Sequence, residues 1–185
     1  METVGGADEQ KNSGLAELRR VSRKAHEAVD EAFSRFDLAD PQSYGDFLTA
    51  HARVLGAAEA YLSRHAASLP VWRPRAALLK NDLLQMGLPV PAVHAECLPE
   101  REGTAMGVLY VLEGSRLGGR VLSARVAEGL PRTYLSAFHQ KGEWPAFLER
   151  LGQYLDESDA VRRQAVTEGA VATFALFRQS AERQD

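Results

Sequence analysis

Three residues near the amino end of the chain share one flank of an expected helix and could together serve a metal. On a helix over residues 15–36, Arg19, His26 and Asp30 fall on one line at about 100° per residue. A carboxylate one turn from an imidazole can hydrogen-bond one ring nitrogen and leave the other nitrogen free as a ligand. The same spacing also fits a half-buried histidine whose partners are Asp30 and water.

The remaining histidines do not complete a metal site with this one. His51, His65, His94 and His139 form no HxxxH or HExxH pattern, and their separations give no zinc signature. A metal held by His26 would therefore need its other ligands from a cofactor or from solvent. Haem meets this condition, because the porphyrin supplies four nitrogens and the protein needs to offer one imidazole.

A second candidate is the stretch GVLYVLEGSRLGGRVLSARV, residues 107–126, in which glycines interrupt a helical apolar pattern. Each glycine destabilises an exposed helix interior by about 0.5–1 kcal/mol relative to alanine. Gly107, Gly114 and Gly118 lie within about 40° of one another, with Ser115 and Gly119 beside them. Such a face allows a close helix crossing, a flat ligand against the backbone, or a bend in the helix. A phosphate cradle is not favoured, because the stretch lacks the GK[ST] and GxGxxG patterns.

The elements that must position these residues are all helices, because no segment shows a convincing period-2 strand pattern. We expect an all-α fold in one domain over residues 14–182, preceded by a disordered tail over residues 1–13. Proline, glycine and capping residues place the helices at residues 15–36, 42–68, 74–86, about 100–128, 132–139, 144–155 and 158–179.

Composition narrows the class of protein further. The chain has 185 residues, a formal net charge of −3 and 45% hydrophobic residues, which is typical of a globular domain that does not bind nucleic acid through its overall charge. Its one cysteine, Cys97, excludes an intramolecular disulfide and a thiolate metal cluster. No apolar run reaches the roughly 18 residues of a membrane span, and no secretory signal is evident. We expect a cytoplasmic protein without membrane contact.

Two motifs together resemble a known family. LAELRRVSRKAHEAVD, residues 15–30, and LYVLEGSRLGGRVL, residues 109–122, resemble the haem (heme) oxygenase family, especially its bacterial biliverdin-producing branch associated with phytochromes. The similarity runs from about residue 14 to residue 180. It implies a single-domain, multihelical haem oxygenase-like fold in which haem lies between a proximal helix and a distal helix kinked at glycines.

On the proximal side, the resemblance assigns a role to each residue of the first motif. His26 matches the proximal ligand of the haem iron, Asp30 a carboxylate that hydrogen-bonds the ligand imidazole, and Arg19 a basic residue that pairs with a haem propionate. Further propionate contacts are assigned to Arg150 and Tyr154, although the carboxyl-terminal part does not align as closely.

On the distal side, Gly114, Gly118 and Gly119 match the glycines that lie over the iron. Ser115 departs from the family pattern, because many members carry an aspartate at this position, where it orders the water that delivers protons during the reaction. A serine hydroxyl can hold a water but has neither the charge nor the proton affinity of a carboxylate. Ordered water near Ser115 and the Gly114 carbonyl is the expected proton source.

The resemblance implies oxidative opening of haem to biliverdin with release of CO and ferrous iron. Haem and O2 are then substrates, and electrons come from an external ferredoxin, flavodoxin or similar reductase, because no flavin or iron–sulfur motif is present. A phytochrome is a possible recipient of the biliverdin. A basic surface for the acidic partner is expected from Arg19, Arg23, Lys24, Arg116, Arg120 and Arg125.

Two other interpretations stay open. The chain could be a non-catalytic haem sensor or carrier that keeps His26 without turnover, or a helical interaction module that takes another ligand. The large aromatic residues do not separate these interpretations, because we expect Trp72, Trp144, Phe174 and Phe177 to lie in the core.

Overall fold

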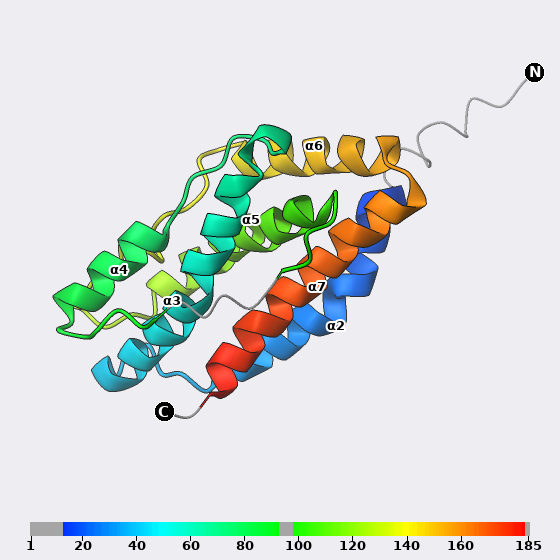
Figure 1. Ribbon diagram of the computed structural model, residues 1–185. Helices are drawn as coiled ribbons and strands as arrows, with labels where there is room; N and C mark the ends of the chain where they lie inside the picture. Colours follow the sequence, from blue (N-terminus) through cyan, green and yellow to red (C-terminus); the bar gives the residue numbers. More distant parts are fainter. Residues whose placement is uncertain (1–12, 93–97, 184–185) are drawn as a thin grey trace, which may run out of the picture.

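The computed structural model describes residues 13–92 and 98–183, and every regular element in these ranges is a helix. Residues 1–12 of the tail expected over residues 1–13 lie outside the described residues, as do His94 and Cys97, whereas Ser13 already belongs to the first helix. The all-α fold is confirmed. The helices are α2 (Ser13–Ser34), α3 (Pro41–Arg64), the short 3-10 helix η1 (Ala66–Ser68), α4 (Ala76–Gln85), α5 (Thr104–Ser123), α6 (Glu143–Glu157) and α7 (Ala160–Glu182) (Figure 1).

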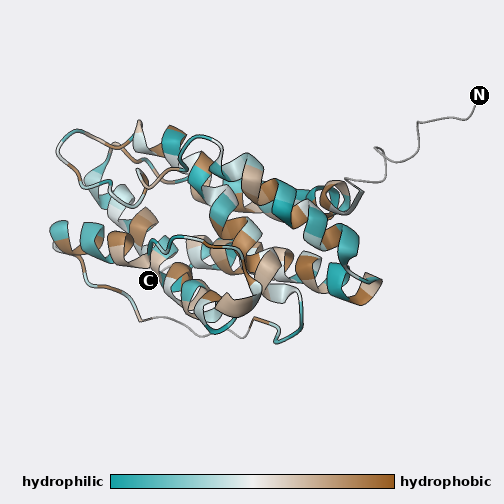
Figure 2. Cartoon of the chain, turned by 90° about the horizontal axis from the view of Figure 1, so that it is seen from above, coloured by the Kyte–Doolittle hydropathy of each residue, from teal (hydrophilic) through white to brown (hydrophobic). Residues whose placement is uncertain are grey.

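Helix α7 is central to the packing. It lies beside α2 and also packs against α3 and α5 (Figure 1). Of the other helices, α4 packs on α3, and α6 packs mainly against α2. By contrast, α2 and α5 make little direct contact with each other among the described residues. Apolar and polar residues are interspersed along the helices, as expected where each helix buries only part of its surface (Figure 2). No helix of the described residues is long and apolar enough to cross a membrane.

Capping residues explain where the long helices begin. At α3 the carboxylate of Asp40 accepts the Ser43 N–H at 2.8 Å, and Pro41 occupies the first helical position. At α7 the carboxylate of Asp159 accepts the Arg162 N–H, also at 2.8 Å. These are the positions that the sequence pattern predicts for Asp40 and Pro41.

The helix expected over residues 132–139 is wrong, because this segment forms turns. Asp82 on α4 is fully buried, and its carboxylate accepts the Tyr134 N–H at 2.8 Å and the Thr133 N–H at 3.2 Å. Because these two N–H groups bind a side chain of α4, the segment packs against α4 and does not form a helix of its own.

The glycine helix α5 also ends earlier than expected, at Ser123 instead of near residue 128. The Ser123 carbonyl accepts a hydrogen bond from Arg132 Nη1 at 3.3 Å, and the Ala127 N–H donates to the Leu38 carbonyl at 3.3 Å. Tertiary hydrogen bonds thus replace the last expected turn of this helix.

Helices α5 and α7 cross with their backbones almost in contact, and glycine on both sides makes this possible. A Cβ atom on Gly107 would lie 1.9 Å from the Val166 carbonyl oxygen, and one on Gly169 would lie 2.5 Å from the Thr104 carbonyl oxygen. The first glycine of the 107–126 stretch is therefore required by helix crossing, one of the three alternatives that the sequence leaves open.

A histidine on α3 lies inside an aromatic cluster. The ring centroid of His51 is 4.5 Å from that of Phe33, 4.4 Å from Phe47 and 5.5 Å from Phe177, and its Nδ1 lies 2.7 Å from the Tyr134 hydroxyl. Burial lowers the pKa of His51 to about 3, with a smaller contribution from the positive charge of nearby Arg75.

This low pKa predicts an acid sensitivity that depends on one side chain. Below pH 6.5 the unfolded chain binds a proton at His51 that the folded chain does not, so stability falls as pH falls. Between pH 7 and pH 5, we expect this effect to remove about 2 kcal/mol of unfolding free energy relative to His51→Gln. Urea unfolding of both proteins at the two pH values measures the difference. Equal pH dependence in the two proteins would contradict the assignment.

Candidate functional site

The imidazole of His26 is accessible and held in one orientation. Its Nδ1 lies 3.0 Å from Asp30 Oδ2, one turn further along α2, and 58% of the His26 side chain is exposed. Because Nδ1 donates to the carboxylate, Nε2 carries the available lone pair. The structure thus brings these two predicted residues together, while Arg19 lies exposed on the same helix.

Helix α7 brings this imidazole close to the start of α5. The rings of His26 and Phe174 pack nearly perpendicular to each other, with centroids 5.4 Å apart, and Phe174 is buried as expected. One turn earlier on α7, Ala170 lies against α5, where a Cβ on Gly107 would be 2.8 Å from the Ala170 nitrogen. Helices α2 and α5 therefore contact successive turns of α7.

The remaining glycines of α5 have different surroundings. A Cβ on Gly119 would lie 2.7 Å from the Leu135 carbonyl oxygen, so this glycine is needed by packing. A Cβ on Gly114 would make an ordinary contact of 3.6 Å with the Trp144 ring of α6, and one on Gly118 would meet nothing within 4 Å. The open part of the glycine face is thus at Gly118. The haem contacts assigned to these three glycines stay predictions.

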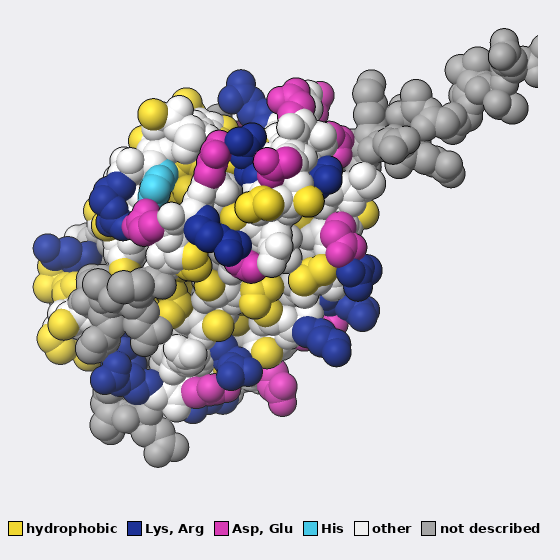
Figure 3. Space-filling model, turned by 45° about the vertical axis from the view of Figure 1, so that its right-hand side comes forward, with side chains coloured by type: hydrophobic (Ala, Val, Ile, Leu, Met, Phe, Trp, Pro, Cys, Tyr) yellow, Lys and Arg dark blue, Asp and Glu magenta, His cyan; other side chains and the backbone are white. Residues whose placement is uncertain are grey.

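Apolar side chains flank the open glycine. Leu117 is 49% exposed and Val121 is 66% exposed, next to Gly118 and one turn apart on α5. Large apolar side chains that face solvent beside an uncovered backbone are typical of a surface that takes a ligand or partner. Apolar side chains also gather in the middle of one face of the molecule, with charged side chains around them (Figure 3).

Ser115 is bound on two sides. Its hydroxyl donates to the Leu112 carbonyl at 2.7 Å and accepts from Arg75 Nη2 at 2.6 Å. Arg75 precedes α4 and is buried, with 3% of its surface exposed, and its guanidinium also lies over the Tyr134 ring at 5.1 Å. The position where many family members carry a carboxylate thus borders a buried cation.

Sequence reasoning missed the buried charges around this segment. The Glu59 carboxylate accepts the backbone N–H groups of Arg75 at 2.6 Å and Ala76 at 3.0 Å, and burial raises the pKa of Glu59 against the effect of these bonds. On α5, Glu113 binds Arg116 at 3.0 Å. The available signal was a charged residue within an apolar helical stripe, as at Leu55, Glu59 and Leu62 on α3.

One expected surface residue is buried instead. Arg116 has 3% of its surface exposed, because its guanidinium binds backbone carbonyls and Glu113. It therefore cannot belong to the expected basic surface. The other members are exposed on α2 and α5 or just after α5: Arg19, Arg23, Lys24, Arg120 and Arg125.

The two residues assigned to the haem propionates lie one turn apart on α6 but have different neighbours. Arg150 borders a cavity of about 350 Å³ lined by Pro70, Val71, Trp72, Arg73, Glu113, Glu143, Ala146 and Phe147. Tyr154 lies near Arg162 and Glu102, whose charges act on it, and burial raises its pKa. Their roles in haem binding stay predictions.

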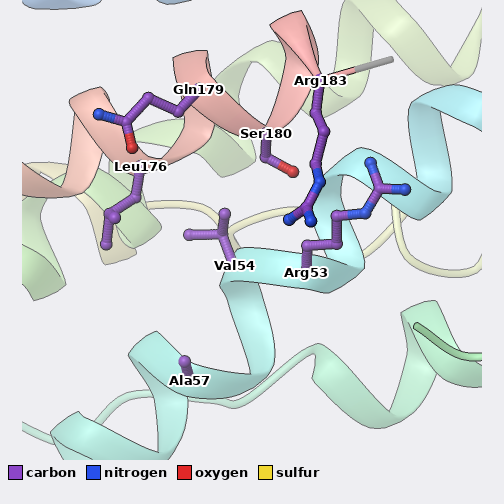
Figure 4. Close-up of a pocket in the computed structure, with 7 residues that line it drawn as sticks. All are labelled: Arg53, Val54, Ala57, Leu176, Gln179, Ser180 and Arg183. Carbon is purple, nitrogen blue, oxygen red and sulfur yellow. The ribbon is translucent and has the colours of Figure 1, made fainter. Parts of the chain in front are cut away.

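A further cavity lies between α3 and the carboxyl end of α7, away from His26 along α2 and α7. Arg53 and Arg183 point into it from opposite walls (Figure 4). Neither this cavity nor the one beside Arg150 is lined by His26 or by a glycine of α5. Both cavities are therefore separate from His26 and the glycines of α5, although Arg150 lines one of them.

The donor set fits haem. Among residues 13–92 and 98–183, no group of three or more His, Cys, Asp or Glu side chains could hold a metal ion. One accessible imidazole with a fixed orientation suits a metal that brings its other ligands with it, and the open, apolar glycine face suits a flat apolar molecule. The fold is that of an all-helical protein, and an accessible imidazole on α2 together with an open glycine on α5 is compatible with a planar ligand that takes one imidazole from the protein.

Comparison with known proteins gives the family. A protein of Xanthomonas campestris pv. campestris (strain 8004) named "Heme oxygenase" is 34% identical to this chain over 147 residues, which cover 75% of this chain and 88% of that protein. No protein-family model matches the chain. The chain belongs to the haem oxygenase family.

Proposed function

We propose that the protein is a haem oxygenase that opens haem to biliverdin and releases CO and ferrous iron. The observation that carries the proposal is the accessible His26 imidazole, held by Asp30 at 3.0 Å, in a chain 34% identical to a haem oxygenase. The open face at Gly118 supports it independently, because only a missing side chain leaves backbone exposed there.

On the proximal side, His26 binds the haem iron through Nε2. Asp30 accepts the hydrogen bond from Nδ1–H, which fixes the tautomer and the ring plane of the ligand. Phe174 supports the ring edge from α7, so the imidazole keeps its orientation although more than half of it is exposed.

On the distal side, haem as substrate supplies the iron and the ring carbon that O2 oxidises. The open α5 backbone at Gly118 would face the haem ring, and the exposed side chains of Leu117 and Val121 would cover apolar porphyrin surface beside it. The hydroxyl of Ser115 donates its proton in a hydrogen bond to the Leu112 carbonyl and accepts one hydrogen bond from Arg75. Its second lone pair can therefore accept a hydrogen bond from an ordered water.

The finer assignments follow from the two motifs. We propose that the chain belongs to the bacterial branch associated with phytochromes, that Arg19 pairs with a haem propionate, and that an acidic ferredoxin or flavodoxin supplies the electrons. The exposed cations of α2 and α5 offer such a partner a basic surface. A cytoplasmic location stays part of this proposal.

The test is a hemin titration followed by reduction in air. We expect a haem absorption band at stoichiometric hemin, and its conversion to biliverdin absorbance when a reductase system is added in the presence of catalase. A band that survives reduction would identify a non-catalytic haem carrier. Absence of a band would contradict the haem site itself.

A further inference from the structure

Two buried arginines connect the middle of α5 with the loop before α4. One lies on the loop and binds α5, and the other lies on α5 and binds the loop. Arg75, at the end of this loop, donates from Nη2 to the Leu112 carbonyl of α5 at 2.8 Å. Arg116, on α5, donates from Nη2 to the Arg73 carbonyl of the loop, and from Nη1 to the Ala137 carbonyl at 2.8 Å. Each element therefore holds the backbone of the other, and Gly114 lies inside the segment that is held.

Two carboxylates balance these cations. Glu59 on α3 fixes the start of α4 through the N–H groups of Arg75 and Ala76, and Glu113 on α5 binds Arg116 Nε at 3.0 Å. A buried ionic network adds little net stability compared with apolar side chains of the same volume. Its specific contribution is to fix one arrangement of the elements that carry it.

The arrangement fixed here includes the Ser115 hydroxyl. The same Nη2 atom of Arg75 that binds Leu112 also donates to Ser115 Oγ at 2.6 Å, and Ser115 donates back to Leu112 at 2.7 Å. The three groups form a closed hydrogen-bonded triangle. These two hydrogen bonds hold the Ser115 hydroxyl in one orientation, although the residue is exposed.

We propose that Arg75 is a positioning residue for haem cleavage, an inference that rests on the proposed function. It acts through Ser115 and through the 112–116 turn of α5, which together set how the distal backbone faces the substrate and hence which bridge carbon is oxidised. The planar guanidinium suits this role, because the two N–H groups of Nη2 point to two acceptors in a fixed plane.

The first test needs no haem. In Arg75→Met, we expect amide hydrogen exchange over residues 112–118 to become at least tenfold faster, while exchange in the α2–α7 pair is unchanged. Arg73→Met is the matched control, because this exposed arginine lies on the same loop but its side chain binds Glu143 at 2.7 Å and the Phe138 carbonyl at 3.2 Å instead of α5. The Arg73 carbonyl that binds Arg116 is kept in this variant. Exchange in Arg75→Met equal to that in the control would overturn the proposal.

The second test uses the haem complex and the isomers of biliverdin that it forms. We expect Arg75→Met to give a mixture of isomers, Arg75→Lys a smaller change, and Arg73→Met the parent product. An unchanged isomer ratio in both Arg75 variants would refute positioning of the substrate. If Arg75→Met does not fold, Arg75→Lys and Ser115→Ala carry both measurements. If the parent chain takes no haem, the proposed function fails, whereas hydrogen exchange still decides whether Arg75 holds α5.

Discussion

Replacing His26 by alanine is expected to lower the affinity for haem by roughly 100-fold, because the substitution removes the proposed ligand of the haem iron. The fold should be unaffected, since the side chain is 58% exposed and alanine favours the helix. Hemin titration followed by absorption, with circular dichroism as a check on folding, measures both effects. Asp30→Asn keeps the His26 imidazole but removes the carboxylate that orients it, and should lower the affinity for haem about 10-fold.

The chain offers a matched control for this change. His65 also pairs with a carboxylate, with its Nε2 3.0 Å from Glu100, but it lies at the carboxyl end of α3. His65→Ala should bind haem like the parent. Added imidazole should restore the absorption spectrum of His26→Ala, because the exposed site admits a small ligand from solvent. A parent-like titration of His26→Ala would rule out this residue as the ligand.

The sequence predicts the long helices well because their determinants are local. The Asp-Pro pair at residues 40–41 and the apolar stripe of α2 involve only residues close together in the sequence. Helices α2 and α3 therefore form where the pattern places them. The helix expected at 132–139 fails for the opposite reason. Its backbone donors are taken by Asp82, which is about fifty residues away in the sequence, and no local pattern reveals that partner.

The candidate site divides in the same way. The pairing of His26 with Asp30 follows from helical spacing alone, and the structure places the two at hydrogen-bond distance. The glycine face could not be resolved from the sequence, because Gly107 and Gly118 look alike on a helical wheel but meet a backbone and open space, respectively. Arg75 was not identified at all, since its partners Leu112 and Ser115 belong to another helix.

Substitution of Gly118 separates ligand binding from folding. A side chain at Gly118 meets nothing within 4 Å, so Gly118→Ala should stabilise the ligand-free chain by about 0.5–1 kcal/mol through helix propensity. Gly118→Leu should fold equally well but lower the affinity for haem at least tenfold, because its side chain fills the space over the backbone. Urea unfolding without haem and hemin titration provide the two measurements.

Gly107→Ala is the contrasting variant, because its Cβ would lie 1.9 Å from the Val166 carbonyl oxygen. Helices α5 and α7 would have to separate, and we expect a loss of about 1–3 kcal/mol in unfolding free energy. Glycine to alanine is thus expected to raise the unfolding free energy at Gly118 and to lower it at Gly107, although both lie on α5. If Gly118→Leu bound haem as tightly as the parent, the ligand would have to lie elsewhere on α5, and the open glycine would reflect only a helix without a neighbour.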